Sequence, residues 1–190
     1  MAAGRKAFGK TPRKLLIAGA PDPLWRGGLS APNSLFLHAD RPLISENGTS
    51  ALLHELTHVI TRIRGERYDD WIAEGVAEFY SVELQRRAGG ISDSRYAITR
   101  RDLREWSRTV KTLRVKHSTG PVTARAVLLL QDLDKEIRQR TKDAKSFDDV
   151  VRELIKKRTV SLEELRAATE AVIGARSRTL DSPLLVKPDA

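Results

Sequence analysis

Apolar residues recur at helical spacing over most of this chain, from residue 49 almost to residue 175. The first stripe consists of Leu52, Leu53, Leu56, Val59, Ile60 and Ile63. Its spacing is that of one face of an amphipathic helix, which Gly65 is predicted to end. Further helices are predicted at 69–88, 92–115 and 122–141, and capping-box patterns start two more at SFDD (146–149) and SLEE (161–164). The chain is therefore predicted to be mostly helical.

Two short apolar runs precede the helical part and are predicted to be strands. They are KLLIAGA at 14–20, which is apolar enough for a buried strand, and SLFLHAD at 34–40. The glycine-containing segment between them is loop-like. We therefore expect an α+β fold, with a short N-terminal β segment followed by a mostly helical lobe. The predicted organisation is a loose tail at 1–13, a single domain at 14–175 and a C-terminal tail at 176–190.

The composition excludes several kinds of site. The 190 residues include no cysteine, so disulfides, thiolate metal sites and thiol nucleophiles are excluded, and any metal ligand must be His, Asp or Glu. No apolar run approaches the length of a membrane span, and none follows the basic N-terminus as a signal peptide requires. If the chain is complete, we expect a cytoplasmic protein. If it is part of a longer exported protein, we expect a periplasmic or secreted one.

The net charge of +9 has two interpretations. A basic protein can attract nucleic acid, anionic membranes or acidic substrates. The basic residues here alternate with acids along the predicted helices, as in Arg101-Asp102 and Arg104-Glu105, which is typical of solvated helix faces with local ion pairs. No zinc-finger, RNA-recognition or glycine-loop motif supports the first interpretation, so no specific nucleic-acid partner is predicted. A nucleic-acid-binding protein, based on the charge alone, is a weaker hypothesis than those given below.

The helix at 49–63 carries the pattern His-Glu-x-x-His. His54 and His58 are four residues apart, so both imidazoles project from one face of the helix. This spacing suits two ligands of one zinc ion, and Glu55 is placed to act as a general base toward water at the metal. The alternative is that both histidines are ordinary surface or core residues.

A catalytic zinc ion needs a third protein ligand, and the next helix offers one. Glu74, in the segment WIAEG, can supply a carboxylate oxygen, and Gly75 would allow this helix to pack closely. Glu78 lies one turn further on the same face and could accept a hydrogen bond from the outer nitrogen of a ligand histidine. Each acid could instead be a solvated helix residue.

Together, HELTH and WIAEGVAEFY resemble the gluzincin metallopeptidases, and most closely the glycyl aminopeptidase group. GGLSAPNSLFL at 27–37 resembles that family's edge-strand segment before the zinc helix. LDKEIRQRTKDAKSFDDVVREL at 133–154 resembles its downstream helix and loop. The resemblance implies a thermolysin-like zincin catalytic domain with His54, His58 and Glu74 as zinc ligands and Glu55 as the catalytic base.

The sequence departs from this family at two positions. Ser30 stands where family members tend to have a glutamate close to the substrate amine. The family's carbonyl-polarising tyrosine is replaced, because the aligned position is Thr123. His117, shortly before that helix, is a possible oxyanion donor, or else an exposed loop histidine.

These features lead to two hypotheses. The first is a zinc-dependent peptidase that hydrolyses peptide or protein substrates, either as an aminopeptidase or as an endopeptidase. The second is a catalytically degenerate gluzincin that keeps its zinc as a binding or regulatory module. The sequence does not predict an oligomeric state.

Overall fold

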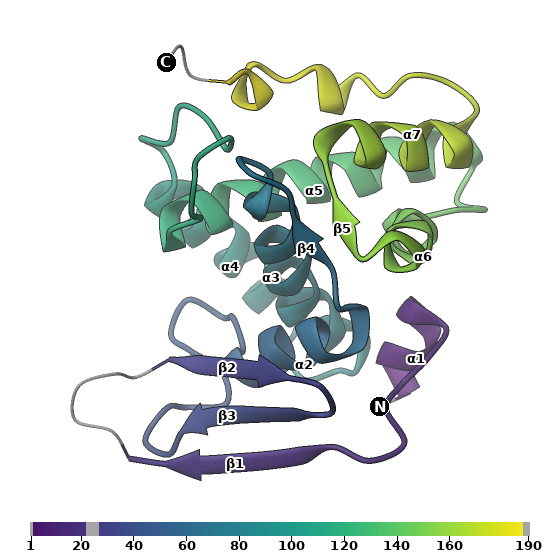
Figure 1. Cartoon of the computed structure of the whole chain (residues 1–190). Helices are drawn as coiled ribbons and strands as arrows, with labels where there is room; N and C mark the ends of the chain where they lie inside the picture. Colours follow the sequence, from purple (N-terminus) through teal and green to yellow (C-terminus); the bar gives the residue numbers. More distant parts are fainter. Residues whose placement is uncertain (1, 22–26, 188–190) are drawn as a thin grey trace. The chain divides into compact units, whose positions relative to one another are not determined.

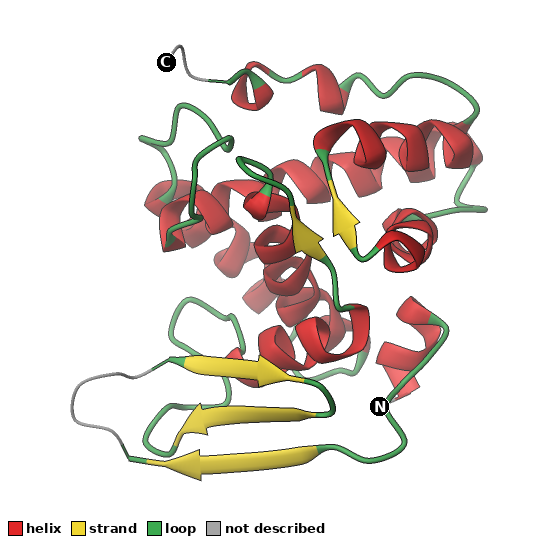
Figure 2. Cartoon of the chain, in the orientation of Figure 1, coloured by secondary structure: helices red, strands yellow, loops and turns green. Residues whose placement is uncertain are grey.

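The computed structural model describes residues 2–21 and 27–187, which form two compact units. The first unit comprises residues 2–62 and 77–102, and the second comprises residues 63–76 and 103–187 within the described range. Two helices, α3 (Asp70–Arg87) and α4 (Asp93–Trp106), contribute residues to both units. The predicted α+β class, with a small sheet and a mostly helical remainder, is confirmed (Figure 2).

The first unit is built on a three-stranded sheet. Its strands are β1 (Leu16–Ala20), β2 (Gly28–Ala31) and β3 (Ser34–His38), in the order β1-β3-β2. β3 is parallel to β1 and antiparallel to β2, so β1 and β2 are both edge strands (Figure 1). Helix α2 (Ala51–Thr61) packs against β2 and β3. This places the helix with the His-Glu-x-x-His pattern directly on the sheet.

The second unit is mainly helical. Its longest helix is α5 (Gly120–Thr141), which packs against α6 (Phe147–Lys157) and α7 (Leu162–Ile173). A two-stranded parallel sheet joins β4 (Arg64–Gly65) to β5 (Thr159–Val160). Two 3₁₀ turns, η1 (Thr179–Asp181) and η2 (Pro183–Leu185), follow α7. The capping boxes predicted at Ser146 and Ser161 are both present.

Both predicted tails contain regular structure. Helix α1 (Ala2–Phe8) replaces the loose N-terminal tail, because Ala7 and Phe8 are buried and the Phe8 ring packs edge-on against Tyr80. At the other end, Leu180 and Leu185 are buried. Met1 and residues 188–190 of these tails lie outside the described residues. The domain boundaries at residues 14 and 175 stay predictions.

Three local expectations differ from the structure. All five residues of β1 are exposed, although its apolar sequence predicted a buried strand, because β1 contacts mainly β3, whereas β2 and β3 are covered by α2. Helix α2 ends at Thr61, with Arg62 in the left-handed region, while Gly65 belongs to β4. Helix α4 ends at Trp106 rather than near residue 115, because the chain that follows bonds to a distant segment, with Leu113 N donating to Leu184 O at 2.8 Å.

Asp69 organises the second unit at the start of α3. Its carboxylate is buried and forms an ion pair with Arg114, whose Nε lies 3.0 Å from Oδ1. Oδ2 also accepts the first backbone N–H of α7, from Leu162, at 3.0 Å. The next residue, Asp70, accepts the backbone N–H of Ser118 at 2.9 Å. Two adjacent acids thus attach the loop before α5 and the start of α7 to the beginning of α3.

Gly75 is the point of closest approach between α3 and α5. A Cβ at this position would lie 2.8 Å from the Cβ of Ala126 and 3.3 Å from Cδ1 of Leu130. The sequence predicted that Gly75 allows α3 to pack closely near the site, and the helix it approaches is α5. Gly75 therefore fixes the position of Glu74 through the packing of α3 on α5.

Glu136 of α5 attaches the segment after α7. Its carboxylate accepts hydrogen bonds from Ser177 Oγ at 2.7 Å and from the backbone N–H groups of Arg178 and Thr179, both at 3.0 Å. Burial alone would raise the pKa of Glu136, but the hydrogen bonds from Thr179, Ser177 and Arg178 outweigh it and lower the pKa to about 2. The ionised carboxylate therefore stabilises the folded chain.

Replacing Gly75 by alanine is expected to destabilise the protein by about 1–3 kcal/mol through overpacking against α5. Urea denaturation measures the change. Gly90→Ala is the matched control, because the nearest atom to its added Cβ, Gln85 O, is 3.4 Å away. Equal stability of the two variants would contradict the tight contact at Gly75.

Glu136→Gln is expected to lower the urea midpoint, by an amount that depends on pH. Because the folded-state pKa lies below the ordinary value of 4.5, the ionised group stabilises fully above pH 4.5, and this contribution is lost as the pH falls toward 2. The difference in urea midpoint between wild type and Glu136→Gln should therefore shrink as the pH falls from about 5 to about 3. A difference that does not change with pH would contradict this role of Glu136.

Candidate metal centre

Helix α2 presents His54 and His58 on one face. Ser50 caps the helix by accepting the N–H of Leu53 at 3.4 Å. The hydroxyls of Thr57 and Thr61 donate to carbonyl groups one turn earlier, at 2.7 and 2.8 Å, and so need no other partner. The Nε2 atoms of the two histidines lie 3.2 Å apart. The two imidazoles thus converge on one point, as their spacing in the sequence predicted.

Helix α3 is enclosed over most of its length. From Trp71 to Gln85 every residue is buried except Glu74 and Glu78, which are half-buried and lie one turn apart. Burying a carboxylate is costly unless it is paired or bound to a metal ion. Glu74 and Glu78 therefore need polar partners, as does the buried Glu83, which accepts a hydrogen bond from the Tyr96 hydroxyl.

Glu78 forms a direct contact with the histidine helix. Its Oε2 accepts a hydrogen bond from Nδ1 of His54 at 2.9 Å. With Glu78 ionised, this bond places the His54 proton on Nδ1 and leaves Nε2 unprotonated, facing Nε2 of His58 at 3.2 Å. The contact is the one that the sequence predicted for Glu78, and its role next to a metal ligand stays a prediction.

Glu74 completes a group of possible metal ligands. One ligand atom each from His54, His58 and Glu74 lies within 4.8 Å of the others, and all three residues are half-buried. In the part of the chain that the structure describes, this is the cluster of His, Asp and Glu that could hold a metal ion. The structure thus brings together the three residues whose ligand role was predicted.

The donor set fits zinc. Catalytic zinc sites use three protein ligands from nitrogen and oxygen donors, and leave one position open. With ligand bonds of about 2.0–2.1 Å and tetrahedral angles, two nitrogen ligands lie about 3.3–3.4 Å apart. The Nε2 atoms of His54 and His58, at 3.2 Å, come close to this separation. A site for a soft metal ion bound by thiolates is excluded, because the chain has no cysteine.

Glu55 lies against the edge strand β2. Its side chain is buried, and a Cβ built on Gly28 would lie 2.8 Å from both Cγ and Oε1 of Glu55. Only glycine at position 28 therefore leaves room for this carboxylate in its present position. The residue pattern alone did not reveal this contact, although the family resemblance implied an edge strand before the histidine helix.

His117 and Thr123 occupy the two positions considered for an oxyanion donor. His117 is exposed in the loop between α4 and α5, and its proposed role stays a prediction. Thr123 is buried in α5, and its backbone N–H donates to the carbonyl oxygen of Thr119 at 2.9 Å.

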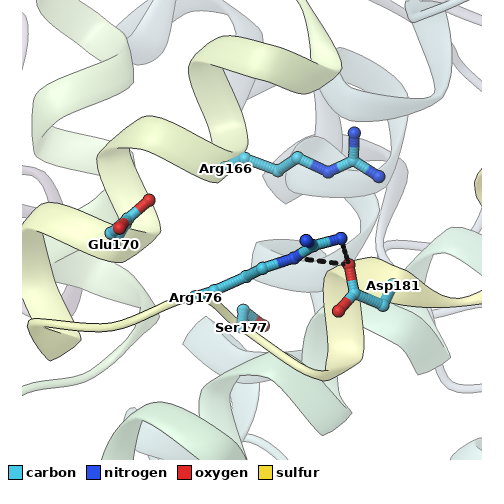
Figure 3. A pocket seen from close by; sticks show the side chains of 5 residues that line it. All are labelled: Arg166, Glu170, Arg176, Ser177 and Asp181. Atoms are coloured by element: carbon cyan, nitrogen blue, oxygen red, sulfur yellow. Dashed lines mark hydrogen bonds and ion pairs between the residues drawn. The ribbon is translucent and has the colours of Figure 1, made fainter.

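A separate cavity of about 310 Å³ lies in the second unit (Figure 3). It is lined by Arg166, Glu170, Arg176, Ser177 and Asp181. Arg176 is paired with Asp181 at 2.6 Å, and the two arginines are balanced by two acids. The cavity contains none of the predicted site residues.

Over the described ranges, 2–21 and 27–187, no helix is both long enough and apolar enough to cross a bilayer.

Comparison with known proteins gives a likeness of fold. No protein-family model and no curated protein sequence matches the chain. A solved structure of an aminopeptidase N family protein from Idiomarina loihiensis superimposes with a TM-score of 0.58 at 15% sequence identity. The match covers 82% of this chain and 34% of that protein. This chain thus shares the fold of about one third of that larger protein.

Glu78→Ala is expected to weaken zinc binding about 10- to 100-fold, because His54 would lose the partner that orients it. Competition titration with a zinc-sensitive dye measures the affinity. Glu105→Ala removes an exposed acid from α4 and should leave the affinity unchanged. If both variants bind zinc like wild type, the proposed supporting role of Glu78 is wrong.

Proposed function

We propose that this chain is a zinc-dependent peptidase of the gluzincin type with a thermolysin-like catalytic fold. The convergence of His54, His58 and Glu74 within 4.8 Å, with Glu55 on the same helix as the histidines, is the observation that carries the proposal. The likeness to part of an aminopeptidase N family protein supports it, because the shared fold extends over 82% of the chain.

His54 and His58 would hold the zinc ion through Nε2, and Glu74 through a carboxylate oxygen. A bound zinc ion would act as a Lewis acid, polarising a carbonyl group and making water more acidic. The hydrogen bond from His54 to Glu78 keeps the ring in the orientation and tautomer that binding requires. The nearby carboxylates also give the site a local negative charge within a chain of net charge +9, which favours a cation.

Glu55 is proposed as the general base. Its carboxylate would take a proton from the attacking water and pass it to the amine that leaves. The packing of its side chain on Gly28 restricts where the carboxylate can point. A base held in a fixed position loses less entropy in the reaction than a mobile one.

The edge strand β2 offers a binding surface for a peptide. Gly27 O accepts the N–H of His38, so in the antiparallel register Gly27, Leu29 and Ala31 bond to β3. The backbone groups of Gly28 and Ser30 therefore point to the free edge. An extended peptide can add to such an edge as a further strand. At Gly28 this would bring its backbone next to Glu55, so we propose peptides or unfolded protein segments as substrates.

A degenerate gluzincin that binds zinc without cleaving is the second candidate. The buried Thr123, in place of the family's tyrosine, favours it. The loss of one oxyanion donor costs about 10²–10³ in kcat in other enzymes. The two candidates share the zinc site and differ in turnover.

Glu55→Gln is expected to abolish cleavage of a peptide library, read by mass spectrometry, while the protein keeps its zinc. The reason is that the amide cannot accept the proton from water, whereas the ligands are unchanged. Glu66→Gln, at an exposed residue after β4, is the control and should cleave like wild type. Zinc binding by wild type without any cleavage would select the degenerate gluzincin. The cleaved positions would show whether the enzyme removes N-terminal residues or cuts internally.

A further inference from the structure

β1 is an exposed apolar strand with one free edge. Its sequence, LIAGA, has no charged residue, and Leu16 and Ile17 are 67% and 52% exposed. Figure 1 shows β1 at the outer edge of the sheet, with β3 between it and β2. Exposed apolar edge strands are prone to pair with another strand, and natural proteins usually protect them with charges or proline. β1 has neither form of protection.

The hydrogen bonds of β1 to β3 determine which of its groups remain free. Leu16 N donates to Asn33 O at 3.0 Å, and Ala20 O accepts from Ala39 N at 3.1 Å. In a parallel ladder with this register, Leu16, Ala18 and Ala20 bond to β3. The backbone N–H and C=O groups of Ile17 and Gly19 therefore point away from the sheet. They form a short ladder with two donors and two acceptors.

We propose that a second copy of this chain pairs with β1, antiparallel, about a two-fold axis through Ala18. In this register Ile17 of each copy exchanges both backbone hydrogen bonds with Gly19 of its partner, which uses all the free groups. Ala18 meets its symmetry mate as a pair that is not hydrogen-bonded. The result is one continuous sheet of six strands.

The side chains of β1 also complement themselves in this register. Ile17 lies opposite Gly19 on one face, and Leu16 lies opposite Ala20 on the other, so each large residue meets a small one. A two-fold interface requires such self-complementarity, because the same residues form both sides. The pairing brings no charged side chain of β1 against another, although each chain carries a net charge of +9. The neutral strand therefore adds no like-charge contact of its own where two basic chains meet.

The absence of cysteine allows a direct test by crosslinking. In Ala18→Cys, the two thiols would face each other across the axis at a Cα separation of about 4.5 Å, which a disulfide can span. Under mild oxidation this variant should form a covalent dimer, and wild type, having no thiol, should not. Leu16→Cys is the matched control on the same face. Its two thiols would lie about 13 Å apart along the strands, so it should remain monomeric under denaturing electrophoresis.

Sedimentation equilibrium of the whole chain provides a second measurement. Wild type should show a monomer–dimer equilibrium. Ile17→Lys should shift this equilibrium to monomer, because a dimer would then hold two lysine charges where the two β1 strands pair. Leu43→Lys adds the same charge at another exposed leucine and should keep the dimer. A wild type that is monomeric at all concentrations, or crosslinking of Leu16→Cys as fast as Ala18→Cys, would overturn the proposal.

Discussion

The burial of α3 is the constraint on which the candidate site depends. A helix enclosed from Trp71 to Gln85 can carry carboxylates only where partners compensate for their lost hydration. Glu78 has such a partner in His54, and Glu74 lies with both histidines. The close contact of Gly75 with α5 holds this part of α3 in place. Apolar packing thus determines where Glu74 and Glu78 lie. The histidines of α2 compensate these two carboxylates for their lost hydration.

Much of the site could be predicted from the sequence because its residues lie on two consecutive helices. Helical periodicity alone places His54 and His58 on one face of α2, and Glu74 and Glu78 on one face of α3. The capping boxes at Ser146 and Ser161 were likewise predictable, since both depend on residues three positions apart. Where the interaction is local in sequence, the pattern determines the structure.

The features that could not be predicted depend on contacts between distant residues. Nothing near Gly28 shows that its missing side chain leaves space for Glu55, 27 positions later. The attachment of Asp69 to Arg114 and Leu162, and of Glu136 to the segment at 177–179, joins residues that are 41 to 93 positions apart. β1 was expected to be buried because of its apolar composition, which does not distinguish a central strand from an edge strand.

The claim that His54, His58 and Glu74 form one zinc centre is tested most directly by metal analysis combined with X-ray absorption at the zinc edge. The purified whole chain should contain about one zinc ion per molecule. Its spectrum should fit nitrogen and oxygen ligands at about 2.0–2.1 Å, with the scattering of two imidazole rings and no sulfur. A chain that binds no zinc when zinc is supplied, or a spectrum with fewer than two imidazole ligands, would contradict the account.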